Sequence, residues 1–374
     1  MVNEVDLNSY KTCKESCPSY GDSREVSCYA NQTLCEKSRR CPNGRIYNCG
    51  FVEADATVCL SDLSSRRYNW IEYKSGHILG QKTECNSGGR SRAIRVDSWW
   101  RWLIHCSYCV CLCDQPSRQS DRYVSLRPAL ASDAANHLVT GVRFVKSGRV
   151  VHVQVQEGEA LARGAVNVST QRWLPVEPVV IPERNIGSTK DGDDYATLRY
   201  EERALDLDDL VAPIGHVVTG LRFRKIGGHL NLEVRVAPID FASGTIYASR
   251  ATWIANDKTS AAEVRPRTKI QLTSPDLPTK SPIASVPDSN TETYVEFQAS
   301  SLERDVSQTT VPFLDAQIVA PQPPVWITGV GLYHKGQPGY GGFVAFRLQT
   351  LNVTDYMVVP QLQELKRAST VSLP

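Results

Sequence analysis

Hydrophobic and polar residues alternate in three stretches of the chain, and each stretch follows a similar short phrase. The phrase places a Thr-Gly pair between apolar residues at positions 137–144, 216–223 and 326–333. After the second copy, one side of the alternation is apolar: Leu230, Leu232, Val234 and Val236. The other side is polar: Asn231, Glu233 and Arg235. A period of two residues is typical of a half-buried β-strand and not of a helix, so the repeat predicts strands.

Each copy of the phrase is followed by a lysine and by a turn that contains glycine. Gly148, Gly227 and Gly336 stand at matching places before the three alternating runs. Two strands joined by such a turn form a hairpin, so the chain is expected to hold three hairpins. An internal repeat of this kind sets the architecture and is interpreted before any single motif.

Further strands surround each copy and begin with a tyrosine or a tryptophan: Tyr123, Tyr195, Tyr294, Trp173 and Trp253. One unit therefore has roughly four short strands. The third unit lacks a following tyrosine strand, whereas Tyr123 stands before the first phrase. We therefore expect residues 122–130 to complete the sheet of the last unit, which would close a ring and remove two exposed edges.

This pattern predicts an all-β protein with a three-fold pseudo-symmetric, β-prism-like domain of three antiparallel sheets, preceded by a small disulfide-rich N-terminal domain. A plain β-sandwich with coincidental Thr-Gly turns is the alternative. The expected divisions are a cysteine-rich domain over residues 1–115, the repeat domain over 116–358 and a C-terminal tail over 359–374. The Pro/Ser-rich stretch 265–290 is expected to cross the outside of the repeat domain as a loop.

All twelve cysteines lie in the first third of the chain, which indicates a disulfide framework. Seven of them fall within residues 12–60, so at least one bridge is expected to leave this segment for Cys85 or the later cluster. The predicted disulfide cysteines are Cys13, Cys17, Cys28, Cys35, Cys41, Cys49, Cys59, Cys85, Cys106, Cys109, Cys111 and Cys113. His105, Cys106 and Cys109 could instead form half of a zinc site, but a disulfide-stapled strand is favoured in a secreted chain.

Three glycosylation sequons agree with a secretory route and begin at Asn31, Asn167 and Asn352. The opening residues 1–6 have no apolar core, so the start is interpreted as a mature or trimmed end. The formal net charge of +2 gives no electrostatic reason to expect nucleic acid or an anionic membrane as a partner. No apolar run is long enough to predict a membrane span.

Two loops carry candidate binding chemistry. The first combines carboxylates with an aromatic ring that could bind sugar hydroxyls, and its carboxylates could also supply oxygens to Ca²⁺: Asp191, Asp193, Asp194 and Tyr195. The second, a glycine-rich hairpin loop at 336–342, offers flat apolar faces and a backbone-lined concavity: Tyr333, Gly339, Tyr340 and Gly341. An ordinary capped turn and a longer hairpin without a ligand are the alternatives.

No catalytic motif is present, so the chain is not expected to be an enzyme. The histidines have no metalloprotease spacing, and neither a nucleophile elbow nor a phosphate-binding glycine loop occurs. We interpret His137, His216 and Trp326 as one repeat position, which favours packing at a strand start. Trp173 and Trp253 are likewise expected to fill the core. No cofactor is predicted.

Several segments resemble a family of secreted arthropod proteins classed as a domain of unknown function. The resemblance covers about residues 122–350 and lies in these stretches: 204–210, 215–224, 308–317 and 333–336. It implies no activity. More loosely, the three Thr-Gly strands are similar to those of jacalin-type lectins and vitelline-membrane outer-layer proteins, both of which are β-prisms. The resemblance therefore implies a lectin-like fold.

Together these features predict a secreted, extracellular protein that recognises carbohydrate. The alternative is a structural or interaction protein of an extracellular matrix, eggshell or hemolymph assembly. The expected partner is a glycan or an extracellular protein.

Overall fold

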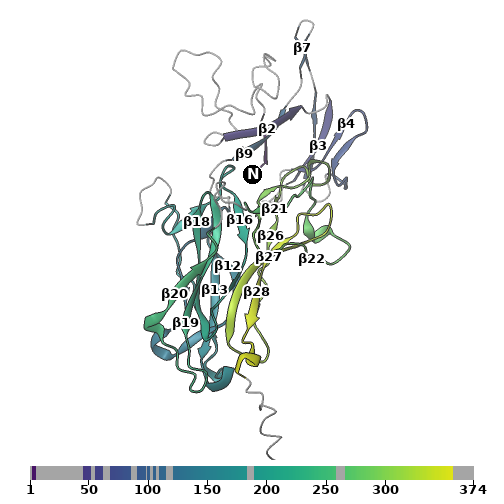
Figure 1. The fold of residues 1–374 in the computed structure, drawn as a ribbon. Helices are drawn as coiled ribbons and strands as arrows, with labels where there is room; N and C mark the ends of the chain where they lie inside the picture. Colours follow the sequence, from purple (N-terminus) through teal and green to yellow (C-terminus); the bar gives the residue numbers. More distant parts are fainter. Residues whose placement is uncertain are drawn as a thin grey trace, which may run out of the picture.

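In the residues that it describes, the computed structural model is all-β with one short α-helix, α1 (Leu302–Asp305) (Figure 1). It describes residues 2–5, 45–51, 55–61, 68–85, 91–97, 99–101, 104–106, 109–114, 121–182, 189–257 and 266–356. Short 3-10 helices occur at Asp133–Ala135, Ala162–Gly164, Val168–Thr170, Ala248–Arg250, Pro278–Lys280 and Val353–Tyr356. The tail expected over residues 359–374 lies outside the described residues. No helix in the described ranges is long and apolar enough to cross a bilayer.

The described segments of the N-terminal third form three small sheets. Strands β1 (Val2–Val5), β9 (Cys109–Asp114) and β2 (Arg45–Phe51) form one sheet in that order. A four-stranded sheet has the order β5 (Ile78–Gly80), β4 (Tyr68–Tyr73), β3 (Ala56–Ser61) and β6 (Ser91–Val96). Strands β7 (Trp99–Arg101) and β8 (Ile104–Cys106) pair with each other.

One disulfide, Cys59–Cys85, joins β3 to the segment that follows β5. It is a bridge that leaves the 12–60 segment, as the odd number of cysteines there predicts. The side chains of the other predicted disulfide cysteines, and the proposed zinc half-site, lie outside the described residues. The disulfide-rich domain as a whole therefore stays a prediction.

The three repeats form three hairpins, each with the same irregularity. The hairpins are β12 (His137–Ser147) with β13 (Val150–Glu159), β18 (His216–Ile226) with β19 (His229–Pro238), and β27 (Ile327–Gly336) with β28 (Phe343–Thr350). The register shifts once in each hairpin, at Thr140, Thr219 and Thr328. The threonine of the repeated phrase is therefore the extra residue of a β-bulge, which bends the strand and increases its twist.

The hairpins lie in three sheets, each of which contains parallel as well as antiparallel pairs. A short strand joins each hairpin in parallel: β10 (Tyr123–Ser125) on β13, β16 (Ala204–Leu207) on β19, and β26 (Phe313–Leu314) on β28. Outer strands are β14 (Arg172–Trp173), β15 (Tyr195–Thr197), β20 (Thr252–Ala255), β21 (Thr268–Lys269), β22 (Val286–Pro287) and β23 (Thr293–Glu296). A separate pair consists of β24 (Gln298–Ala299) and β25 (Thr310–Val311). The expected all-antiparallel sheets are therefore wrong.

A crossing segment leaves each unit and pairs with the Thr-Gly strand of the next one. Strand β11 (Ala129–Leu130) pairs with β18, and β17 (Asp209–Val211) pairs with β27. The third crossing segment returns to the first hairpin, because Val319 exchanges two backbone hydrogen bonds of 2.9 and 3.0 Å with Val142. The pairing thus runs from the first unit to the second, to the third and back to the first.

The prediction that residues 122–130 complete the last sheet is wrong. Strand β10 pairs with β13 of its own unit and with β15, whereas β11 joins the second unit. The physical reason is that each hairpin needs a parallel partner beside its second strand, and β10 fills this place in the first unit. The tyrosine-led strands are not equivalent, because β15 and β23 lie one strand further out than β10 and β16.

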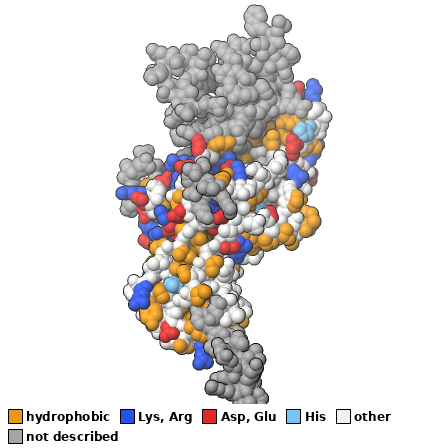
Figure 2. Space-filling model, in the orientation of Figure 1, with side chains coloured by type: hydrophobic (Ala, Val, Ile, Leu, Met, Phe, Trp, Pro, Cys, Tyr) orange, Lys and Arg blue, Asp and Glu red, His pale blue; other side chains and the backbone are white. Residues whose placement is uncertain are grey.

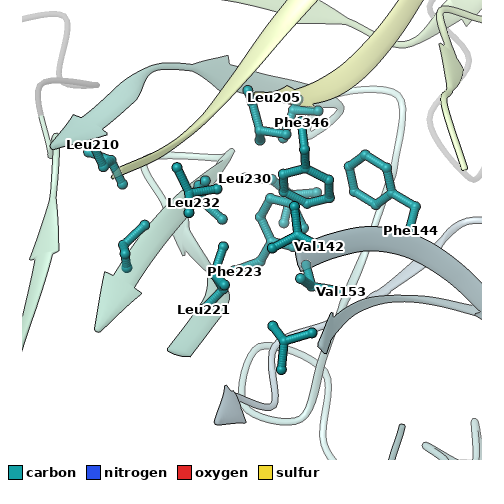
Figure 3. Close-up of a cluster of buried hydrophobic side chains, with 14 of the residues drawn as sticks. Val142, Phe144, Val153, Leu205, Leu210, Leu221, Phe223, Leu230, Leu232 and Phe346 are labelled. Atoms are coloured by element: carbon teal, nitrogen blue, oxygen red, sulfur yellow. The ribbon is translucent and has the colours of Figure 1, made fainter. Parts of the chain in front are cut away.

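The core lies where the three hairpins meet. Phe144, Phe223 and Phe346 come from different hairpins and point toward one another (Figure 3). The ring centroid of Phe144 lies 4.3 Å from that of Phe346 and 6.5 Å from that of Phe223. Because all three units bury their apolar faces in one cluster, no hairpin is expected to be stable by itself.

The expected role of Trp173 and Trp253 as core residues is wrong. Both are half-buried on the outer sides of their sheets, each beneath an arginine guanidinium, at 4.5 Å from Arg143 and 4.1 Å from Arg222. Their chain neighbours Leu174 and Ile254 pack against the core instead. Adjacent residues of a strand point to opposite faces of the sheet. The prediction therefore chose the wrong one of two neighbouring residues as the core residue in each strand.

The glycine of the repeated phrase is needed because the crossing segment lies on it. A Cβ at Gly220 would be 2.5 Å from Leu130 Cδ2 and 3.0 Å from the carbonyl oxygen of Ala129. Gly220→Asn is therefore expected to lower the free energy of unfolding by about 3 kcal/mol. At Gly148 a Cβ would meet open space, and asparagine tolerates its positive φ of 59°. Gly148→Asn should cost under about 1 kcal/mol in urea unfolding, and equal losses would contradict this explanation.

Candidate functional site

A buried ionic network lies on the outer side of the seven-stranded sheet that contains β18 and β19. The guanidinium of Arg267 donates to both carboxylate oxygens of Asp208, at 2.9 and 2.7 Å, and its Nε lies 3.3 Å from Asp206 Oδ2. All three side chains are at most 4% exposed. A buried charge is stable only when its remaining hydrogen-bonding groups are also satisfied. The three charged side chains therefore need further hydrogen-bond partners from neighbouring residues.

Neighbouring strands satisfy most of these groups. Asn231 of β19 donates to Asp206 Oδ2 at 3.2 Å and to the carbonyl of Asn256 at 2.9 Å. Asn256 Nδ2 and the backbone N–H of Glu292 donate to Asp208. Asn231 Oδ1 is buried with no hydrogen-bond partner among the described residues. The carboxylates of the network therefore accept several hydrogen bonds, whereas the amide oxygen of Asn231 accepts none among the described residues.

His229 connects this network to the surface. Its Nδ1 lies 2.7 Å from Asp206 Oδ1. Because an ionised carboxylate only accepts hydrogen bonds, Nδ1 is the donor of this pair, and in the neutral imidazole Nε2 is then an acceptor. The histidine side chain is 20% exposed, and the ring of Tyr294 lies beside it at a centroid distance of 4.7 Å. Asp206 thus fixes both the tautomer and the orientation of the imidazole.

Charged side chains continue this surface. Lys269 Nζ lies 2.7 Å from Glu296 Oε2, and Arg203 approaches the same oxygen at 3.6 Å. We call His229, Tyr294, Lys269 and Glu296 the polar rim. It combines an aromatic face with donors and acceptors of both charges, which is suited to a ligand rich in hydroxyl groups. On the face of the molecule shown in Figure 2, acidic and basic side chains of the described residues are interspersed.

Among the described residues, no group of three or more His, Cys, Asp and Glu side chains is placed to hold a metal ion. The carboxylates of the buried network are occupied by Arg267 and by amide donors, as given above.

The loop predicted at 191–195 satisfies its own carboxylates. Asp191 accepts from the backbone N–H of Thr197 and pairs with Arg199. The backbone N–H of Lys190 and then the Arg127 side chain lower the pKa of Asp194. Tyr195 is buried against Tyr123, and burial raises its pKa. Asp191 and Asp193 are exposed, whereas Asp194 is half-buried.

The glycine-rich loop at 336–342 is held by its neighbours. The carbonyl of Gly339 accepts from Asp276 N–H and from Arg304 Nη1, and the N–H of Gly341 donates to the carbonyl of Asp276. Tyr340 lies 5.9 Å from the Arg304 guanidinium. A Cβ at Gly341 would lie 2.4 Å from Val311 Cβ. The glycine is therefore required for packing.

The two predicted loops belong to different sheets. Residues 191–195 enter β15, which lies in the sheet of the first hairpin, whereas residues 336–342 connect β27 to β28. Tyr333 is on the third sheet, 5.6 Å from the Arg347 guanidinium. The described interactions do not bring these residues together into one site.

Two of the predicted glycosylation sites lie in described segments. Asn352 is exposed, whereas Asn167 is half-buried and donates its side-chain amide to Glu159 at 2.8 Å. Asn31 lies outside the described residues.

Sequence reasoning missed Asp206, His229 and Arg267. It assigned the polar side of the second alternating run to solvent, yet Asn231 and Glu233 are almost fully buried. One signal could have found Asp206. It precedes the Thr-Gly pair of the second unit by the same number of residues as Asp315 precedes the pair of the third unit. The partner Arg267 is distant in sequence and gave no such signal.

A comparison with family models found a match to part of the chain. A family model described as Domain of unknown function (DUF4803) matches residues 1–155. The match shows similarity to a domain of unknown function over these residues, which are less than half of the chain. The matched range overlaps the expected range of 122–350 only at 122–155. No curated protein matches the chain.

Proposed function

We propose that this chain, whose first 155 residues match a domain family of unknown function, is a secreted extracellular binding protein that recognises carbohydrate. The observation that carries the proposal is the polar rim, in which buried Asp206 orients His229 beside the ring of Tyr294. Sugar hydroxyls would donate to His229 Nε2, and the ring of Tyr294 would pack against a pyranose face.

The wider architecture supports this proposal. Three hairpins with matching bulges, joined in a cycle by crossing segments, support a β-prism-like domain. The disulfide Cys59–Cys85 agrees with an oxidising extracellular compartment. The proposed cysteine-rich N-terminal domain and the exposed sequon at Asn352 fit the same route.

A glycan array tests the proposal, with and without added Ca²⁺. We expect at least one glycan class to bind, and Tyr294→Ala to lower its affinity about tenfold, which corresponds to loss of roughly 1.4 kcal/mol. Tyr247→Ala is the matched control, because Tyr247 is an exposed aromatic residue in another loop. Asp193→Ala and Tyr340→Ala examine the two loops proposed from sequence.

An array without hits would remove the carbohydrate proposal. If Asp193→Ala or Tyr340→Ala lowers the affinity for the bound glycan and Tyr294→Ala does not, the binding site lies in one of the two loops and not at the polar rim.

An extracellular interaction protein is the second candidate, and one observation favours it. The loop that contains edge strand β22 exposes several apolar residues, including Pro282, Ile283, Val286 and Pro287. Exposed apolar strips of this kind occur at protein interfaces. Native mass spectrometry that shows only a monomer, alone and with extracellular extract, would count against this function.

A further inference from the structure

The loop between β24 and β25 leaves the repeat domain and enters the core of the N-terminal four-stranded sheet. Val306, at the end of α1, is 2% exposed. It packs in the same cluster as Val58, Ile71 and Leu79 of that sheet. A Cβ at Gly80 would lie 3.0 Å from Val306 Cγ2. The small core of this sheet is therefore completed by a residue more than two hundred positions away.

A glutamine follows Val306 and bonds to the backbone of the same sheet. Gln308 Oε1 accepts from the N–H of Tyr68, and its Nε2 donates to the Tyr68 carbonyl, both at 2.9 Å. One side-chain amide thus satisfies both backbone groups at the beginning of β4, as a neighbouring strand would. At the surface, His77 Nε2 lies 2.8 Å from Glu303 Oε2.

The same turn is anchored to the repeat domain on its other side. The fully buried Asp305 accepts from Ser300 Oγ at 2.8 Å, and the N–H of Ser301 donates to the carbonyl of Pro275. Arg304 Nη1 donates to the carbonyl of Gly339 in the hairpin loop at 3.2 Å. Residues 301–308 therefore connect the N-terminal sheet to the third hairpin.

The backbone of this turn is strained. Val306 and Ser307 have φ angles of 52° and 50°, although neither is glycine. The left-handed conformation is unfavourable for residues with a Cβ and rare for a β-branched residue. Strain of this kind persists only where surrounding contacts hold it in place. The contacts of Val306 and Gln308 with the sheet act here together with the hydrogen bonds of the turn itself, from the N–H of Val306 to the carbonyl of Leu302 and from the N–H of Ser307 to that of Ser301.

We propose that residues 301–308 form an interdomain latch that holds the sheet β3–β6 closed on the repeat domain. Release of the latch relieves the strain at Val306 and Ser307 and uncovers the apolar face around Ile71 and Leu79. The latch is independent of the carbohydrate proposal, since none of its residues belongs to the polar rim.

Hydrogen–deuterium exchange on the full chain tests the latch. Val306→Asp places a charge in the small core, and we expect amide exchange in residues 68–80 to rise at least tenfold. Exchange in the hairpins β12–β13 and β18–β19 should not change. Leu302→Asp is the matched control on the same helix, because Leu302 is 41% exposed and lies in the first turn, where an acid is tolerated.

Ser307→Gly provides a variant that is expected to fold. Glycine accepts the left-handed conformation without strain, so exchange in residues 68–80 should slow. Unchanged exchange of residues 68–80 in Val306→Asp, equal increases throughout the chain, or faster exchange in Ser307→Gly would each overturn the latch.

Discussion

Arg267→Ala is expected to lower the free energy of unfolding by about 3–5 kcal/mol. Removal of the guanidinium leaves Asp206 and Asp208 buried without a charge partner, and these carboxylates are at most 4% exposed. Their remaining donors are His229 Nδ1, the amides of Asn231 and Asn256, and the backbone N–H of Glu292. These neutral donors cannot replace a bidentate cation. Urea unfolding of the variant and the parent chain measures the loss.

A surface pair provides the control for this result. Arg199 pairs with Asp191, but its side chain is 55% exposed, so Arg199→Ala should cost at most about 1 kcal/mol. A second comparison separates charge from packing. Arg267→Met combined with Asp206→Asn and Asp208→Asn should be more stable than the sum of the separate losses, because it removes the unpaired charges. Strict additivity would contradict the network.

Trp326→Ala is expected to cause a similar loss, about 3–5 kcal/mol. Trp326 is fully buried at the end of the repeat domain, where it packs with Leu138, Val217 and Ile239. Its indole Nε1 donates to the carbonyl of Ala165 at 2.8 Å. The substitution therefore leaves a large cavity and an unsatisfied carbonyl where parts of all three repeat units meet.

Trp253→Ala is the matched comparison. Trp253 is half-buried beneath Arg222 on an outer side of its sheet, so its loss should be about 1–2 kcal/mol. The thermal unfolding midpoint and urea unfolding both report the difference. If the two tryptophan variants lost the same stability, Trp253 would have the core role that the repeat pattern first indicated.

Most of the repeat domain could be predicted from local patterns. The alternation in each copy identified its second strand, and the glycine turn identified the hairpin, because both depend on neighbouring residues. The odd number of cysteines in residues 12–60 predicted that a bridge leaves this segment, as Cys59–Cys85 does, but it did not predict which cysteine forms it. The crossing segments could not be placed in this way, because short strands such as β11 and β17 have no distinctive pattern of their own.

The candidate site shows the same limit. Asp193 and Tyr340 belong to loops whose composition suits a ligand, yet the loops lie on different sheets. His229, Asp206 and Arg267 are unremarkable in the sequence and meet only because β19, β16 and β21 lie in one sheet. Val306 and Gln308 likewise gave no sign that they contact Ile71 and Tyr68.

The sequence by itself determined an all-β chain built on three copies of one hairpin, since a period of two residues and a glycine turn act within a few residues. The tertiary structure decided which strand lies beside each hairpin, which polar residues are buried, and how the N-terminal sheet is attached. Those outcomes depend on pairing between distant segments, where burial of a shared core and of opposite charges outweighs any local preference.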